Sequence, residues 1–191
     1  HAVYNLKSKR FLDNAGKWSW QPGSYHAKAA IGLLDIAAIT ENDDFAGKAM
    51  QLCENAVELQ QKNGRFITNK SDNSTHLHPH CYSAEGLLYA GIKLKEEKFV
   101  GAAEKAAEWA MANQTGNGGV NAFFDGKWNN SQRSDVAAQV LRLAAALKSI
   151  GRAQGIADEK TGALCKRLLS FQNMKAGGQQ GGFFYGQELD G

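Results

Sequence analysis

The sequence predicts an all-α fold built as an array of three helical hairpins, and an internal repeat is the main reason. Gly32-Leu33-Leu34 recurs as Gly86-Leu87-Leu88, 54 positions later (86 − 32). Gln60 recurs as Gln114 with the same separation, and a weaker third copy ends at Gln172. Each copy is long enough for two helices with apolar residues at three-and-four spacing. The repeat therefore predicts three consecutive helix pairs.

Length and composition agree with a single domain. The chain has 191 residues, of which 43% are hydrophobic and 21% charged, with a net charge of +3. This composition is ordinary for a globular domain. We expect one domain over residues 1–191, with repeats at about 18–66, 67–120 and 121–186.

The charge pattern and the apolar pattern exclude several classes of protein. Lys and Arg are scattered rather than clustered, so we expect no nucleic-acid partner. No apolar run reaches the roughly 18 residues that a membrane-spanning helix needs, and the first residues do not form a signal peptide. These absences favour a cytoplasmic location without a membrane partner. The three cysteines are widely spaced and do not suggest a disulfide framework.

In the first hairpin, Ser24 is predicted to cap a helix that runs from Tyr25 to about Thr40. Its small side chains suit a helix that is packed on several sides. Asp43 and Asp44 are expected to begin the partner helix, because acidic groups favour the positive end of the helix dipole.

The second and third hairpins repeat this order. Pro79 is placed where the first turn of a helix tolerates proline, and that helix should continue to about Lys95. The third hairpin should begin at the capping pair Ser134-Asp135 and break at Gly151. Its partner helix is expected from about Asp158 to Gln172.

A glycine turn follows each partner helix, at Gly64, Gly118 and Gly181. Glycine at these positions predicts a left-handed backbone that ends the helix. The turns at Gly64 and Gly118 lead into long loops, residues 67–78 and 121–133. Loops of this length in a compact array are more often functional than accidental.

The repeat and the segment from Thr75 to Leu88 resemble the α/α-toroid proteins. These are the six-hairpin glycosidases, related polysaccharide lyases and epimerases, and the terpenoid cyclase and prenyltransferase group. The resemblance covers roughly residues 18–186 and implies an α/α-toroid-like arc, a partial α/α barrel. Because a closed toroid has more than three hairpins, the chain is expected to be part of a longer toroid, an open arc, or one half of a homodimeric ring.

Three of the five histidines lie close together, at His76, His78 and His80. In an extended strand the three side chains would share one side, which is a spacing suited to zinc. A helix that starts at Pro79 would turn His80 away from the other two, so we predict no metal site and no cofactor. Binding of substrate, capping of the helix and a structural role remain alternatives for these histidines.

Two carboxylates are candidate catalytic residues. Glu85 lies in a helix otherwise rich in Ala, Gly and Leu, close to Tyr82, and Asp135 lies at the start of the equivalent third helix. They could flank one cleft as a glycosidase pair, with His80 as a third catalytic candidate. The alternatives are that Glu85 reaches solvent and that Asp135 only stabilises the start of its helix.

Repeat-equivalent basic residues suggest an anion site. His26 and His80 are 54 positions apart (80 − 26), and Arg133 follows His80 by 53 (133 − 80). Three such groups at adjacent helix starts could bind a uronate or a phosphate. Loop aromatics could stack on sugar rings. The candidates for substrate binding are therefore His26, His76, His78, Tyr82, Arg133, Trp18, Trp20 and Trp128.

The resemblance implies a carbohydrate-active protein, a hydrolase or a lyase, that acts on or binds a polysaccharide at the rim formed by the helix starts. The alternative from another class is a non-catalytic helical-repeat module that binds a glycan or a protein. An isoprenoid-processing toroid would need an Asp-rich motif or a zinc triad, and the sequence has neither.

Overall fold

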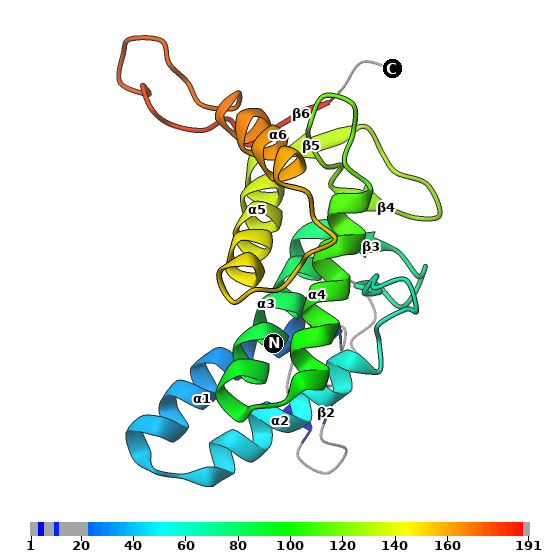
Figure 1. Cartoon of the computed structure of the whole chain (residues 1–191), viewed down its shortest axis with the longest axis vertical. Helices are drawn as coiled ribbons and strands as arrows, with labels where there is room; N and C mark the ends of the chain where they lie inside the picture. The colour runs from blue at the N-terminus through cyan, green and yellow to red at the C-terminus, as the bar shows by residue number, and fades with distance from the viewer. Residues whose placement is uncertain (1–3, 6–9, 12–22, 189–191) are drawn as a thin grey trace.

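The structure is a computed structural model that describes residues 4–5, 10–11 and 23–188. Six α-helices dominate it, joined by short strands and loops (Figure 1). The elements in chain order are β1 (Tyr4–Asn5), β2 (Arg10–Phe11), the 3-10 helix η2 (Ser24–Lys28), α1 (Ala29–Thr40), α2 (Asp43–Val57), β3 (Thr75–His76), α3 (Leu77–Leu94), α4 (Glu97–Ala112), β4 (Phe123–Phe124), β5 (Ser131–Arg133), α5 (Ser134–Ser149), α6 (Asp158–Leu169) and β6 (Gly186–Glu188).

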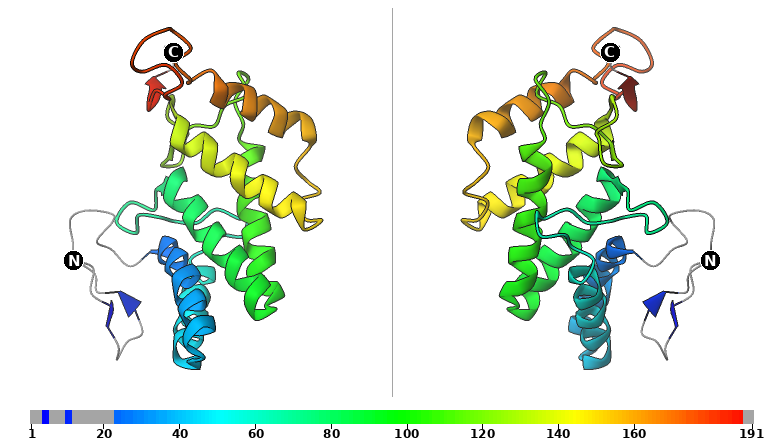
Figure 2. Two further views of the ribbon diagram at one scale, coloured as in Figure 1. Left: turned by 90° about the vertical axis from the view of Figure 1, so that its left-hand side faces the viewer. Right: turned by 90° about the vertical axis from the view of Figure 1, so that its right-hand side faces the viewer.

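The helices pair as three consecutive hairpins, α1 with α2, α3 with α4, and α5 with α6. The first helices of the hairpins form one layer, in which α3 packs between α1 and α5. The first and third hairpins lie at opposite ends of the array, and the second lies between them (Figure 2). This arrangement confirms the predicted all-α array, an α/α-toroid-like arc.

The core is centred on the second hairpin because only that hairpin has a neighbour on both sides. Nine of the residues of α4 are buried, whereas α6 buries only Leu164. At Gly86 of α3, an added Cβ would lie 2.2 Å from the carbonyl oxygen of Ala27, so the absence of a side chain lets η2 and α3 approach closely. The repeat-equivalent Gly32 has open space around it, and α1 buries only Ala30 and Leu34. Helix α1 is therefore less covered than its composition predicts.

The repeated glutamines join successive hairpins. The side-chain amide of Gln60 donates to the carbonyl of its own turn, Gly64 (3.0 Å), and to Ala102 of α4 (2.7 Å). The repeat motif seen in the sequence is thus a contact between backbone carbonyls and a side-chain amide. The turn glycines Gly64, Gly118 and Gly181 have the predicted left-handed backbone, with φ of +93°, +82° and +85°.

The predicted helix starts are wrong in detail. Ser24 is buried in η2 and accepts a hydrogen bond from Ser83 of α3 rather than capping the helix. Helix α3 begins at Leu77, two residues before Pro79, because the Leu77 N–H donates to the Ala122 carbonyl in the neighbouring loop. Helix α5 has Arg133 at its N-cap with no side-chain cap. In each case a tertiary contact replaces the local cap.

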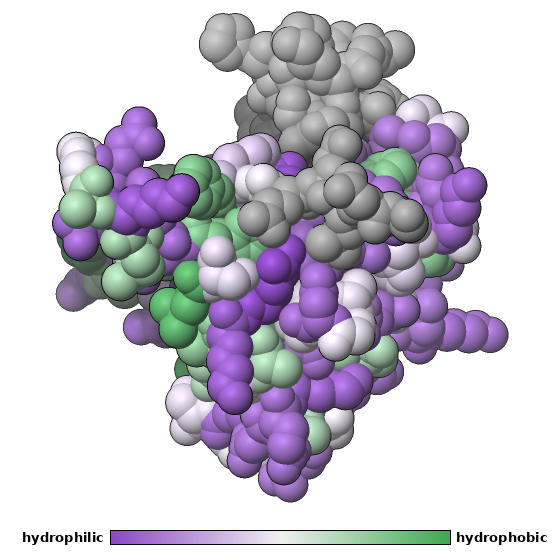
Figure 3. Space-filling view, turned by 90° about the horizontal axis from the view of Figure 1, so that it is seen from above, coloured by the Kyte–Doolittle hydropathy of each residue, from purple (hydrophilic) through white to green (hydrophobic). Residues whose placement is uncertain are grey.

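Two short antiparallel pairs connect the long loops. Strand β3 pairs with β4, and β5 pairs with β6 so that Arg133 lies opposite Gly186. The second pair brings the C-terminal segment back to the start of α5. Seen from above, hydrophilic and hydrophobic side chains are interspersed on the visible face (Figure 3). In the described part of the chain, no helix has the length and apolar character needed to cross a bilayer.

Candidate functional site

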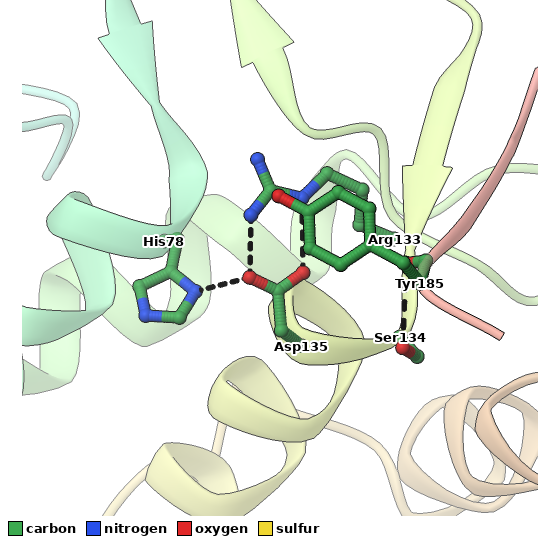
Figure 4. A network of polar contacts seen from close by, with 5 residues as sticks. All are labelled: His78, Arg133, Ser134, Asp135 and Tyr185. Carbon is green, nitrogen blue, oxygen red and sulfur yellow. Dashed lines mark hydrogen bonds and ion pairs between the residues drawn. The ribbon is translucent and has the colours of Figure 1, made fainter. Parts of the chain in front are cut away.

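The first residues of α3 and α5 bring three polar side chains into direct contact (Figure 4). Nδ1 of His78 lies 2.7 Å from Oδ2 of Asp135. Arg133 binds the same carboxylate through both Nε (2.9 Å) and its terminal nitrogen (2.5 Å). The ring of Tyr185 lies against the Arg133 guanidinium, at 4.4 Å from its centroid, and the Tyr185 carbonyl accepts a hydrogen bond from the Ser134 N–H.

The charge of this group is fixed by its contacts. Partial burial raises the pKa of Asp135, but the hydrogen bonds and the positive charge of Arg133, with the contact to His78, outweigh burial and lower it. Asp135 is therefore an anion that only accepts hydrogen bonds, so Nδ1 of His78 carries the hydrogen. In the neutral imidazole this leaves Nε2 as the basic nitrogen.

A second group of charged side chains continues along the same side of α3. The ring of Tyr82 contacts that of His78 edge-on at 4.5 Å, and the ammonium of Lys28 lies 4.4 Å from the Tyr82 ring centroid. Lys28 and Arg142 both form ion pairs with Glu85. Burial and the charge of Arg142 lower the pKa of Lys28. We call these residues, together with His78, Arg133 and Asp135, the α3–α5 cluster.

A small cavity lies at the Glu85 end of the α3–α5 cluster. It has a volume of about 30 Å³ and is lined by residues of α3 and α5, Glu85, Arg142 and Gln139 among them. Cavities that enclose a small-molecule ligand typically measure about 300–1,000 Å³. The cavity has room for about one or two water molecules. The cluster in this chain is therefore one wall of a site and does not enclose a ligand.

His80 lies apart from the α3–α5 cluster. It is fully buried, with Nδ1 accepting from the Phe66 N–H (3.2 Å) and Nε2 3.1 Å from the Ala106 carbonyl oxygen. Burial lowers the pKa of His80 to about 4. The expectation that His80 is catalytic, or shares an anion site with Arg133, is therefore wrong, because helix α3 directs its side chain into the interior.

The other sequence-predicted residues are placed separately. His26 packs against Tyr25, with ring centroids 4.5 Å apart, and His76 packs against Phe123 at 4.7 Å. Trp128 donates a hydrogen bond to Asn113 and stacks with Trp109 and Phe124, at the hairpin end away from His78. Trp18 and Trp20 lie outside the described residues. The structure thus brings together His78, Tyr82, Glu85, Arg133 and Asp135 from the predicted set.

Sequence reasoning missed three residues of this region. Arg142 lies seven positions after Asp135, which places both on one face of α5, and this spacing could have identified it. Lys28 is 57 positions from Glu85, close to the repeat spacing. Tyr185 had no comparable signal, because its position depends on the pairing of β6 with β5.

No protein-family model and no curated protein matches the sequence. Solved structures do match the fold. A cellobiose 2-epimerase from Bacillus thermoamylovorans B4167 superposes with a TM-score of 0.66 at 11% identity, over 86% of this chain and 44% of that one. A D-mannose isomerase gives 0.58 at 9% identity, over 79% and 42%. An alpha-amylase from Clostridium perfringens gives 0.54 at 14% identity, over 78% and 42%.

All three structures are six-hairpin glycosidase-like α/α toroids, which confirms the predicted fold relationship. At these identities the likeness is to the fold alone. This chain spans less than half the length of each solved structure that it matches here.

Proposed function

We propose that the protein is a carbohydrate-active protein that binds a sugar against the α3–α5 cluster. The proposal is supported by the cluster's position at the starts of α3 and α5 and by the three carbohydrate-related solved structures of the same fold. Charged and hydroxyl-bearing side chains are suited to hydrogen bonding with sugar hydroxyls. Tyr82, Tyr185 and the aliphatic parts of the arginines offer surface for the apolar face of a sugar ring.

The observation that carries the choice of reaction is the contact between His78 and Asp135. A carboxylate that holds Nδ1–H fixes the imidazole ring and leaves Nε2 to take a proton, as a general base does. Nε2 would remove hydrogen as a proton from the carbon next to a sugar carbonyl or carboxylate, and the bonding electrons would move to that group's oxygen. The cations of Arg133, Lys28 and Arg142 favour such an anionic intermediate.

Hydrolysis by a pair of carboxyl groups is less well supported. A glycosidase pair needs one carboxylic acid that keeps its proton until it protonates the leaving oxygen. The pKa of Asp135 is lowered, and Glu85 forms ion pairs with two cations. The cluster is therefore better suited to a reaction that begins by removing a carbon-bound proton, as in a lyase, an isomerase or an epimerase.

Incubation in D₂O with mannose, cellobiose, a maltooligosaccharide and a uronate oligosaccharide, followed by NMR, tests this proposal. Proton removal predicts deuterium at the carbon next to the carbonyl or carboxylate, or an unsaturated uronate product. Hydrolysis would instead produce new reducing ends. His78→Ala and Asp135→Asn should remove the deuterium signal, whereas Lys98→Ala, an exposed pair with Glu54 on the outer helices, should leave it unchanged. Deuterium incorporation that survives His78→Ala would refute the assigned role.

A non-catalytic glycan-binding module is the second candidate function. The observation that favours it is the small cavity at the cluster, which leaves a ligand exposed to water. Saturable binding of an oligosaccharide by calorimetry, with neither deuterium incorporation nor new reducing ends, would support this alternative. Absence of binding to any of the four sugars would count against both functions.

A further inference from the structure

Each internal junction between hairpins contains the same pair of hydrogen bonds, which we call the glutamine clamp. The amide of Gln114 donates to its own turn at Gly118 (2.8 Å) and to Lys160 of α6 in the next hairpin (2.9 Å). Gln60 makes the equivalent bonds to Gly64 and Ala102. One side chain thus joins a glycine turn to the second helix of the following hairpin.

The turn glycine belongs to the same contact. A Cβ added at Gly64 would lie 2.2 Å from the carbonyl oxygen of Lys105 in α4, and one added at Gly118 would lie 2.9 Å from that of Ala163 in α6. Both glycines therefore allow the backbone of the turn to touch the backbone of the next helix. Hydrogen bonding and close approach occur together at both internal junctions.

The third hairpin carries the same clamp with no helix against it. Gln172 donates to its own turn at Gly181 (3.1 Å), and within residues 23–188 its amide makes no bond to a further helix. A Cβ at Gly181 would meet no atom within 4 Å, although the φ of +85° is that of the other two turns. Beside it, 55% of the Leu169 side chain is exposed. The end of α6 thus presents a preformed surface for the second helix of another hairpin.

The opposite end of the array offers a matching helix. The 54-residue repeat places Lys48 of α2 at the position of Ala102, the helical acceptor of the first clamp (102 − 54), and Lys48 is exposed. In the neighbouring helix α1, 43% of Ile36 is exposed. The equivalent residues of the other hairpins, Ala90 and Leu143, are 0% and 3% exposed. The first hairpin therefore exposes a face that the array buries elsewhere.

We propose that the α6 end of one copy, at Leu169, Gln172 and Gly181, binds the α1–α2 end of a second copy through the glutamine clamp. The second copy is favoured because the α1–α2 hairpin carries the repeat position that the clamp recognises at both internal junctions. A head-to-tail contact of this kind can close when the rotation per copy is suitable. Two copies, each spanning 42–44% of a solved six-hairpin toroid, approach the size of one ring. Closure would also add walls to the open α3–α5 cluster.

Light scattering and sedimentation of the 191-residue chain over a wide concentration range test the proposal. A concentration-dependent dimer is expected. Gln172→Ala should weaken the dimer roughly three- to tenfold, as loss of one hydrogen bond at an interface does. Leu169→Glu and Ile36→Glu should weaken it more strongly, one from each face. Ile150→Glu is the matched control, because Ile150 is 44% exposed but lies at the start of the α5–α6 connection, away from the clamp.

Gln114→Ala makes the same chemical change at an internal junction and separates association from folding. It should lower the Tm of the monomer, whereas Gln172→Ala should leave the monomer Tm unchanged and affect only the dimer. Circular dichroism identifies any variant that fails to fold, and Gln172→Ala then decides, since no bond to another helix is lost within the chain. A monomer at every concentration would overturn the proposal. So would a dimer insensitive to Gln172→Ala, Leu169→Glu and Ile36→Glu, because its contact would lie elsewhere.

Discussion

The buried histidine in α3 makes the stability of the protein depend on pH. Nδ1 of His80 accepts a hydrogen bond from the Phe66 N–H, and its Nε2–H donates to the Ala106 carbonyl. A second ring proton would lie against the Phe66 N–H and place a charge in the apolar interior. Burial, together with the charge of Arg65, therefore lowers the pKa to about 4 from the ordinary value of 6.5, although the Ala106 contact opposes the shift.

Below pH 6.5 the unfolded chain binds a proton at this position that the folded chain does not bind. The free energy of unfolding should therefore fall as the pH decreases from 6.5 towards 4. From the two pKa values, the loss is about 2 kcal/mol by pH 5 and about 3 kcal/mol below pH 4. Above pH 6.5 the full contribution is present.

Urea unfolding followed by circular dichroism at pH 5 and pH 8 measures this loss. His80→Gln is the matched variant, because glutamine offers one donor and one acceptor but does not titrate in this range. The variant should be less stable at pH 8 and should lose about 2 kcal/mol less than the parent between pH 8 and pH 5. Comparing the two proteins cancels the contributions of Asp135 and His76, whose pKa values are also lowered. An equal pH dependence in both proteins would refute the neutral, buried state assigned to His80.

Two further predictions concern local packing and capping, and both can be checked by urea unfolding. Gly86→Ala should destabilise the fold by about 2–4 kcal/mol because its Cβ would meet the Ala27 carbonyl, whereas Gly32→Ala at the repeat-equivalent position should be neutral or stabilise by up to about 1 kcal/mol; equal effects would contradict the close approach of η2 and α3. Asn42→Ala should cost about 1 kcal/mol, because the Asn42 side chain accepts the Asp44 N–H at the start of α2. Retention of stability in Asn42→Ala would show that this cap contributes little.

Within the α3–α5 cluster, the sequence identified several members but not their contacts. His78 and Asp135 were selected separately, one from a histidine-rich segment and the other as half of a carboxylate pair with Glu85. The structure pairs His78 with Asp135 and gives Glu85 to Lys28 and Arg142. These partners come from three different hairpins, and no spacing along one helix specifies how adjacent hairpins are rotated.

The sequence by itself determined the number of hairpins, the helix partners and the left-handed glycine turns. These features follow from local periodicity and from backbone conformations that glycine favours, so each is encoded within a few residues. Tertiary structure alone decided the helix starts and the fate of each polar side chain. Ser24 bonds to α3 instead of capping its own helix, and His80 points inward while His78 meets Asp135. A polar group takes the partner that packing brings within reach, and that partner here lies more than 50 residues away in the chain for Ser24 and His78.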